Sequence, residues 1–240
     1  MATISVIGIG SGGINTLDVL LKNKINGILY TAIDTDVESL EYSLATEKLL
    51  LGEGIVGEHG TEGNPELGQE AALARIADLR LLIEACDIVI LLACAGGGTG
   101  SVVINILSDI AHHLGKLTIV LTSRPFIFEG SKRNDRASEC FSDLFTKTDL
   151  LVILPLDDMA VDIPKDTLML DVFRRVDSII AKAAEYLIGI LQDTGTLPLN
   201  IDEVYFDRGY YFYNVSIWDE DRYQRAYYIY LDLPDQYLIQ

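Results

Sequence analysis

Residues 91–103 read LLACAGGGTGSVV, and this stretch decides the fold. Its first residues continue an apolar run that begins at Ile88 and is typical of a buried strand. The apolar positions after Ser101 recur at the spacing of an amphipathic helix. Between the strand and the helix lies a glycine loop, made of Gly96, Gly97, Gly98, Thr99, Gly100 and Ser101. The stretch therefore predicts a strand, a loop and a helix in succession.

The glycine loop predicts a binding site for an anion such as phosphate. Glycines allow backbone N–H groups to turn toward one point, and the following helix adds its unpaired donors and the positive end of its dipole. The loop contains no lysine, and the pair Gly115 and Lys116 leads into an apolar strand, so the loop differs from the Walker pattern. The alternative interpretation is a tight turn that holds no ligand.

Two earlier junctions resemble this arrangement. The apolar residues 4–9 lead into a first loop that contains Gly10, Ser11, Gly12, Gly13 and Asn15, followed by a helix. The next apolar stretch, residues 28–33, ends at Asp34, whose short polar side chain can reach a ligand beyond the carboxyl end of a strand. We expect both loops at one edge of a parallel sheet.

A third loop covers residues 52–68, which include six glycines, among them Gly60 beside Thr61. We expect this loop at the same site as the first two. The alternative is a long surface loop that holds no ligand. Further along, we expect strands at 117–121 and 150–154 and helices at 133–145 and 166–190. This alternation predicts an α/β fold with a doubly wound, mainly parallel sheet. Residues 1–200 would form this domain.

The C-terminal part of the chain has a different composition. Residues 205–237 hold nine of the twelve tyrosines, and residues 210–217 and 227–231 are typical of two strands around a polar turn. We therefore expect a tyrosine-rich C-terminal β-hairpin within an appendage of residues 201–240.

Composition limits the classes of partner. The net charge of −18 argues against nucleic acid or an anionic membrane surface, because both would be repelled. The three cysteines lack metal-ligand spacing, which favours reduced thiols. No apolar run approaches the length of a membrane span, and the chain passes directly into its first strand. These features predict a cytoplasmic protein.

Taken in order, these junctions resemble the nucleotide-binding domain of the tubulin/FtsZ superfamily, most closely its FtsZ branch, over residues 3–202. The resemblance implies that the glycine loop wraps the phosphates of GTP or GDP, with Mg²⁺ as the metal, although it assigns no residue to the metal. Residues 124–133, RPFIFEGSKR, are the most specific further match. In the family this glutamate, here Glu129, contacts the ribose, and the following arginine, here Arg133, lies near the nucleotide.

Base recognition can also be argued from chemistry. Phe173 and Asp177 are four residues apart in the predicted long helix and therefore share a face. An aromatic ring can stack on a purine, and a carboxylate can accept hydrogen bonds from guanine N1–H and its 2-amino group, which adenine lacks on that edge. Guanine is the predicted base. The alternative is a core phenylalanine beside a solvated aspartate.

The resemblance implies an FtsZ-like GTPase whose site is completed by head-to-tail self-association or by another FtsZ-like subunit. Asn200 and Asp202 match the family's catalytic loop, in which the aspartate of one subunit would polarise the attacking water at the next subunit's phosphates. The chain departs from the family at Tyr205, where an acidic residue is expected, at Glu62, where glycine is common, and at Leu156, where a polar residue is usual. The family's second domain is also missing.

Two other functions compete with an active GTPase. The departures favour a catalytically weak protein that binds GTP or GDP and acts in assembly or interaction. The spacing of Gly8, Gly10 and Gly13, followed by Asp34, fits the dinucleotide fingerprint of an NAD-dependent enzyme. That fingerprint leaves the central glycine loop and Glu129 unexplained.

Overall fold

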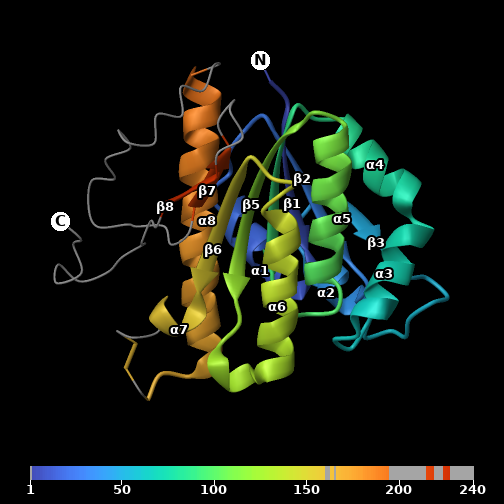
Figure 1. The fold of residues 1–240 in the computed structure, drawn as a ribbon, viewed down its shortest axis with the longest axis vertical. Helices are drawn as coiled ribbons and strands as arrows, with labels where there is room; N and C mark the ends of the chain where they lie inside the picture. The colour runs from blue at the N-terminus through green and yellow to red at the C-terminus, as the bar shows by residue number, and fades with distance from the viewer. Residues whose placement is uncertain (1, 160–162, 165, 195–214, 219–223, 228–240) are drawn as a thin grey trace.

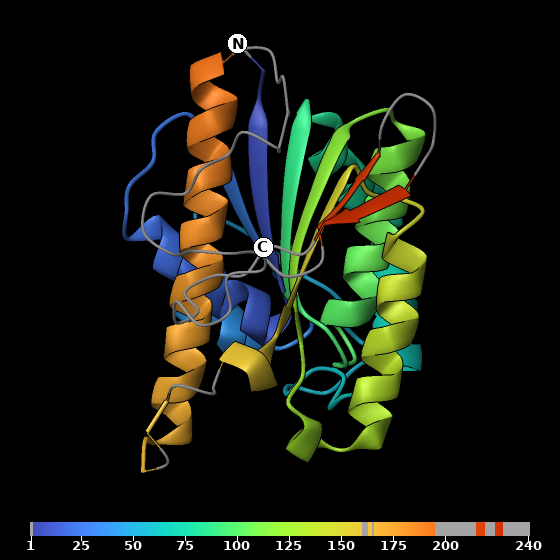
Figure 2. The same ribbon diagram turned by 60° about the vertical axis from the view of Figure 1, so that its left-hand side comes forward.

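The computed structural model describes residues 2–159, 163–164, 166–194, 215–218 and 224–227. Strands and helices alternate along the chain, and the helices cover both faces of one twisted sheet (Figure 1). The view in Figure 2 shows the sheet between α8 and α1 on one side and α5 and α6 on the other. The predicted α/β class is confirmed.

Six parallel strands form the main sheet in the order β3-β2-β1-β4-β5-β6. They are β1 (Ile4–Ile9), β2 (Ile28–Asp34), β3 (Glu47–Leu50), β4 (Ile88–Cys94), β5 (Leu117–Arg124) and β6 (Leu150–Pro155). The chain builds the sheet outward from β1 to β3 and then in the opposite direction from β4 to β6. The point at which the order reverses therefore lies between β1 and β4, where ligands bind in sheets of this kind.

The helices follow the strands closely. They are α1 (Gly10–Leu21), α2 (Val37–Tyr42), α3 (Pro65–Ala74), α4 (Ile76–Glu84), α5 (Gly100–His113), α6 (Ser131–Leu144), α7 (Leu156–Met159) and α8 (Met169–Thr194), with a 3-10 turn η1 (Ile127–Glu129). The helix expected at 166–190 begins later, at Met169, and Leu168 O, just before it, accepts from Val172 N at 3.2 Å. It also continues to Thr194.

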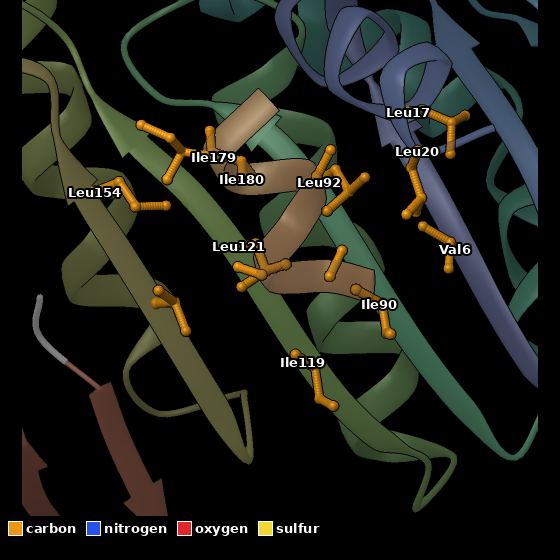
Figure 3. Packing of buried hydrophobic residues seen from close by; sticks show 14 of the residues in the cluster. Val6, Leu17, Leu20, Ile90, Leu92, Ile119, Leu121, Leu154, Ile179 and Ile180 are labelled. Atoms are coloured by element: carbon orange, nitrogen blue, oxygen red, sulfur yellow. The ribbon is translucent and has the colours of Figure 1, made fainter. Parts of the chain in front are cut away.

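The core has two layers, one on each face of the sheet. Ile90 and Leu92 of β4 belong to the cluster shared with α1 and α8, whereas Val89 and Leu91 belong to the cluster shared with α5 and α6. Figure 3 shows the first layer, in which side chains of β4 and β5 meet Ile179 and Ile180 of α8. Both faces of β4 are thus buried, which explains why its sequence is a continuous apolar run rather than an alternating one.

Two short strands are described beyond α8. Strand β7 (Val215–Trp218) runs antiparallel to β6, and β8 (Gln224–Tyr227) runs antiparallel to β7. The residues between and around them are outside the described parts of the chain, as are the domain boundary at residue 200, Asn200, Asp202 and Tyr205. The tyrosine-rich hairpin expected over residues 210–231 is therefore not confirmed.

Candidate functional site

A cavity of about 400 Å³ lies at the carboxyl ends of the parallel strands, at the point where the strand order reverses. Ile9 at the end of β1 and Cys94 at the end of β4 both line it. The cavity brings together most of the site residues expected from sequence: Gly10, Ser11, Gly12, Asn15, Asp34, Thr61, Gly97, Gly98, Thr99, Gly100, Glu129, Arg133, Phe173 and Asp177.

The remaining described candidates lie behind the cavity wall and shape it. A Cβ atom at Gly13 would lie 2.2 Å from Leu92 O, so this glycine allows α1 to pack directly on β4. A Cβ at Gly60 would lie 2.5 Å from Thr35 Oγ1. Gly96 has a φ of +90° and donates its N–H to Ser101 Oγ at 2.6 Å. Gly13, Gly60, Gly96 and Ser101 therefore support the loops and do not line the cavity.

Two helix N-termini meet at the cavity without a side-chain cap. Helix α1 begins at Gly10 and α5 begins at Gly100, and in neither does the N-cap side chain bond to the first turn. The two helix starts adjoin, since a Cβ at Gly10 would lie 3.3 Å from Gly100 N. By contrast, Asp36 caps α2 and Asn64 caps α3. The first-turn donors of α1 and α5, with their dipoles, are thus directed at a shared space suited to an anion.

Thr99 explains why α5 is not capped, and it joins three loops. Its Oγ1 lies 2.7 Å from Thr35 Oγ1 and 3.2 Å from Thr61 Oγ1. The hydroxyl therefore forms hydrogen bonds with these two side chains and not with the first-turn N–H groups of α5. All three threonines are buried. Hydrogen bonds of this kind hold the loops after β2, before α3 and after β4 in one arrangement before any ligand binds.

Asp34 is a buried carboxylate on the cavity wall. It is 2% exposed and accepts hydrogen bonds from Thr35 N at 2.7 Å and Ser11 Oγ at 3.2 Å. Burial outweighs these bonds and raises the pKa of Asp34 to about 6. The nearby negative charge of Asp36 acts in the same direction.

We expect Asp34→Asn to raise the free energy of unfolding at neutral pH. Because the folded state raises the pKa from 3.8 to about 6, the native protein binds this proton more tightly than the unfolded chain. The contribution of Asp34 to stability is therefore greatest below its pKa in the unfolded chain. It falls as pH rises through the pKa in the folded state, by about 3 kcal/mol in total. Urea unfolding without nucleotide should show the variant more stable by about this amount at about pH 8, with the difference vanishing toward about pH 4.

A matched control for this substitution is Asp87→Asn. Asp87 also accepts a backbone hydrogen bond, from Thr3 N at 2.8 Å, but it is exposed. The control should not stabilise the protein at the higher pH. If Asp34→Asn were less stable than the wild type there, the buried charge would not be the dominant cost at this position.

Glu129 and Arg133 form a second wall of the cavity. Glu129 Oε1 accepts from Phe126 N at 2.8 Å, and its Oε2 pairs with Arg133 Nε at 3.1 Å. The glutamate side chain is 15% exposed, whereas the arginine side chain is 46% exposed. The carboxylate is thus fixed by the turn at η1, and the guanidinium extends toward solvent.

Phe173 and Asp177 lie on the same face of α8 and both line the cavity, as their spacing predicts. The Phe173 ring packs edge-on against Phe126, with ring centroids 5.8 Å apart, and the residue is 37% exposed. Asp177 Oδ1 accepts a hydrogen bond from Thr16 Oγ1 at 3.0 Å. Burial raises the pKa of Asp177 to about 6, and the Thr16 hydrogen bond opposes this change.

The cavity also contains residues that we did not assign to it from sequence. Some could have been found because they end a strand or continue a named loop, namely Ile9, Thr35, Asp36, Cys94, Ala95, Ser123 and Pro125. Leu156 and Glu62 were noted as departures from the family, and both line the cavity. His59 and Gly63 lie within the third loop, residues 52–68, and Val176 adjoins Asp177 in α8, so each could also have been found from its neighbours.

Glu62 adopts a backbone conformation that favours glycine, the residue common at this position in the tubulin/FtsZ superfamily that the sequence resembles. Its φ is +48°, in the left-handed region that L-residues disfavour. The residue is exposed at the edge of the cavity. Glu62 therefore brings a negative charge and local backbone strain to the end of the cavity where the glycine loop lies.

Comparisons with known proteins agree with this geometry. Residues 3–162 match the model of the Tubulin/FtsZ family, GTPase domain. The cell division protein FtsZ of Pseudomonas aeruginosa is 32% identical over 203 residues, which cover 85% of this chain and 52% of that protein. The chain thus spans about half the length of this curated relative.

Solved structures give the same result. The FtsZ dimer of M. jannaschii superposes with a TM-score of 0.76 at 29% identity, covering 85% of this chain and 59% of that one. CetZ2 from Haloferax volcanii, a GTPγS-bound protofilament, superposes with a TM-score of 0.72 over 80% of this chain and 61% of that one; at 19% identity it supports the fold alone. In the described parts of the chain, no helix is both long and apolar enough to cross a bilayer. With the family match over two-thirds of its length, this chain belongs to the tubulin/FtsZ family.

Proposed function

We propose that this chain binds GTP and GDP in the cavity and hydrolyses GTP in a site completed by a second subunit. The observation that carries the proposal is the meeting of two uncapped helix N-termini, α1 and α5, at one end of the cavity. Donors and dipoles directed at one point suit a chain of phosphates. The cavity is also lined by an aromatic ring and a carboxylate, those of Phe173 and Asp177, which suit guanine.

Mg²⁺ fits this arrangement when it is held chiefly by the nucleotide. Among the described residues, no group of three His, Cys, Asp or Glu side chains could hold a metal ion. The cavity is rich in carboxylates, including Asp34, Asp36 and Glu62, so bound phosphates would meet negative charge. A magnesium ion bound with the nucleotide would offset that charge and would stabilise the charge that develops in phosphoryl transfer.

Hydrolysis would require Asn200 and Asp202 from a neighbouring subunit. Both follow α8 in the sequence, and the resemblance to the family implies that such a loop acts at the next subunit's phosphates. The relative described as an FtsZ dimer supports contact between subunits as the way to supply them. Asp202 would polarise the attacking water and Asn200 would orient it.

We expect Asp202→Ala to bind GDP normally and to lose about 10-fold or more of its GTP hydrolysis. Mixing it with Gly97→Ala, which keeps Asp202 but should bind nucleotide about 100-fold more weakly, should restore activity, because an intact site then meets an intact loop. Phosphate release per subunit should also rise steeply with wild-type concentration. Mixtures that stay inactive, together with a wild-type rate independent of concentration, would exclude the shared site.

The second candidate is a nucleotide-binding assembly protein with weak catalysis, which the strained, charged Glu62 favours. It predicts tight GDP binding with little phosphate release at any concentration. The NAD-dependent enzyme is less well supported, because the cavity uses the glycine loop after β4 as much as the one after β1. Mass spectrometry of co-purified nucleotide would distinguish GDP from NAD.

The organisation of the chain is part of the proposal. Residues 1–200 would form the GTP-binding domain, and residues 201–240 a catalytic-loop remnant with a tyrosine-rich hairpin. A reducing, cytoplasmic location is supported by the cysteines Cys86, Cys94 and Cys140, which form no disulfide.

A further inference from the structure

Thr16 links two helices that are far apart in sequence. It lies in α1, is 1% exposed, and its Oγ1 donates to Asp177 Oδ1 of α8 at 3.0 Å. The same oxygen lies 3.3 Å from Gly12 O, one turn earlier in α1. The contact with Gly12 is the ordinary bond of a helical threonine to its own helix. The contact with Asp177 joins elements 161 positions apart and needs a separate explanation.

A hydroxyl has one proton, so Thr16 can donate fully to only one of these acceptors. The ionised Asp177 carboxylate is both nearer and charged, and it therefore forms the stronger hydrogen bond. Each carboxylate oxygen can accept two hydrogen bonds, so this bond still leaves lone pairs on both oxygens for a base. It fixes the rotation of the carboxylate while leaving it able to accept.

Charged groups near Asp177 have partners of their own, so the orientation of its carboxylate depends on Thr16. The other titratable groups that line the cavity come from β2, β4, η1, α6 and the loops before α2 and α3. Glu129 and Arg133 pair with each other at 3.1 Å, and the remaining groups are Cys94, Asp34, Asp36, His59 and Glu62. Asp18 of α1 accepts hydrogen bonds from Ser43 and Leu44 instead. Among the described residues, Thr16 donates a hydrogen bond to the Asp177 carboxylate.

We propose that Thr16 is a positioning residue for base selection, holding the Asp177 carboxylate in the orientation that accepts from guanine N1–H and its 2-amino group. This inference rests on the proposed binding of guanine nucleotides. Because α1 begins at Gly10, which lines the cavity and adjoins Gly100 N at the start of α5, one helix would then hold both the base-reading carboxylate and the phosphate donors in register.

The test compares Thr16→Val, which keeps the shape and removes the hydroxyl, with Thr16→Ser, which keeps the hydroxyl. Affinities for GDP, ADP and inosine diphosphate, which lacks the 2-amino group, are measured by calorimetry between about pH 5.5 and pH 8.5. We expect Thr16→Val to weaken GDP about 10-fold with ADP unchanged, and Thr16→Ser to stay within about 2-fold of the wild type. The lower pH limit of GDP binding should rise in Thr16→Val, since the hydroxyl no longer favours the ionised carboxylate.

A merely structural role for Thr16 would give a different pattern. Equal losses for GDP and ADP with an unmoved pH profile would overturn the inference. A double-mutant cycle adds a second measurement, because in an Asp177→Asn background Thr16→Val should change GDP affinity less than about 2-fold. If Thr16→Val does not fold, Thr16→Ala and Thr16→Ser give the same comparison.

The failure of the inference can be told apart from the failure of the proposed function. If the wild type binds no guanine nucleotide, or binds GDP and ADP equally, the proposed function is wrong. If the wild type prefers GDP and Thr16→Val keeps that preference and its pH profile, only the role of Thr16 is wrong.

Discussion

Gly97→Ala will fold normally and bind GDP about 100-fold more weakly than the wild type. Gly97 lines the cavity in the loop before α5, and an added Cβ there would have no protein atom within 4 Å. Nothing in the protein resists the methyl group, so only a ligand in the cavity can be affected by it. Calorimetry with GDP, together with urea unfolding of the nucleotide-free protein, measures the two effects separately.

Two other glycines serve as controls. Gly57 also has no atom within 4 Å of an added Cβ but lies outside the cavity, so Gly57→Ala should change neither stability nor affinity. At Gly98 a Cβ would lie 2.5 Å from Thr61 Oγ1 and 2.7 Å from Asn64 N. Gly98→Ala should therefore lower both the stability of the protein and its affinity for GDP. Full GDP affinity in folded Gly97→Ala would show that the loop is only a turn.

Asp177→Ala should abolish the preference for guanine. We expect about 100-fold weaker binding of GDP, since N1–H and the 2-amino group would lose a charged acceptor in the cavity. ADP has neither donor on that edge, so its affinity should change little. Calorimetry with both nucleotides should therefore give similar, weak affinities in the variant.

Asp171→Ala is the matched control on the same helix. Asp171 lies in the first turn of α8, is exposed, and pairs with Arg174 at 3.1 Å, outside the cavity. Its removal should leave both affinities unchanged. A parallel fall in GDP and ADP affinity in Asp177→Ala would mean that the carboxylate supports the cavity without reading the base.

Much of the architecture follows from short sequence patterns. The apolar run that became β4 and the glycines after it were sufficient to predict a strand, a loop and a helix, because a strand buried on both faces has no polar alternation. Asp34 was placed correctly at the carboxyl end of its strand. Phe173 and Asp177 were paired correctly because helical spacing alone puts them on one face.

Other features depend on distances that a sequence does not contain. Glycines that face a cavity and glycines that let backbones approach one another look alike, so Gly13 could not be separated from Gly12. Close backbone packing explains part of the dinucleotide-like spacing of Gly8, Gly10 and Gly13. A Cβ at Gly8 would lie 2.8 Å from Gly13 O. The bond from Thr16 to Asp177 was missed because it depends on how α1 and α8 pack.

The three linked threonine hydroxyls also bear on local unfolding. Thr35, Thr61 and Thr99 come from segments separated by long intervals in the chain, yet their oxygens form one chain of hydrogen bonds. Any one segment that opens leaves a buried hydroxyl of another without its partner, which costs free energy and favours the opening of all three together. The backbone amides of these segments should therefore exchange with deuterium as one cooperative unit, and a bound nucleotide should slow all of them by a common factor.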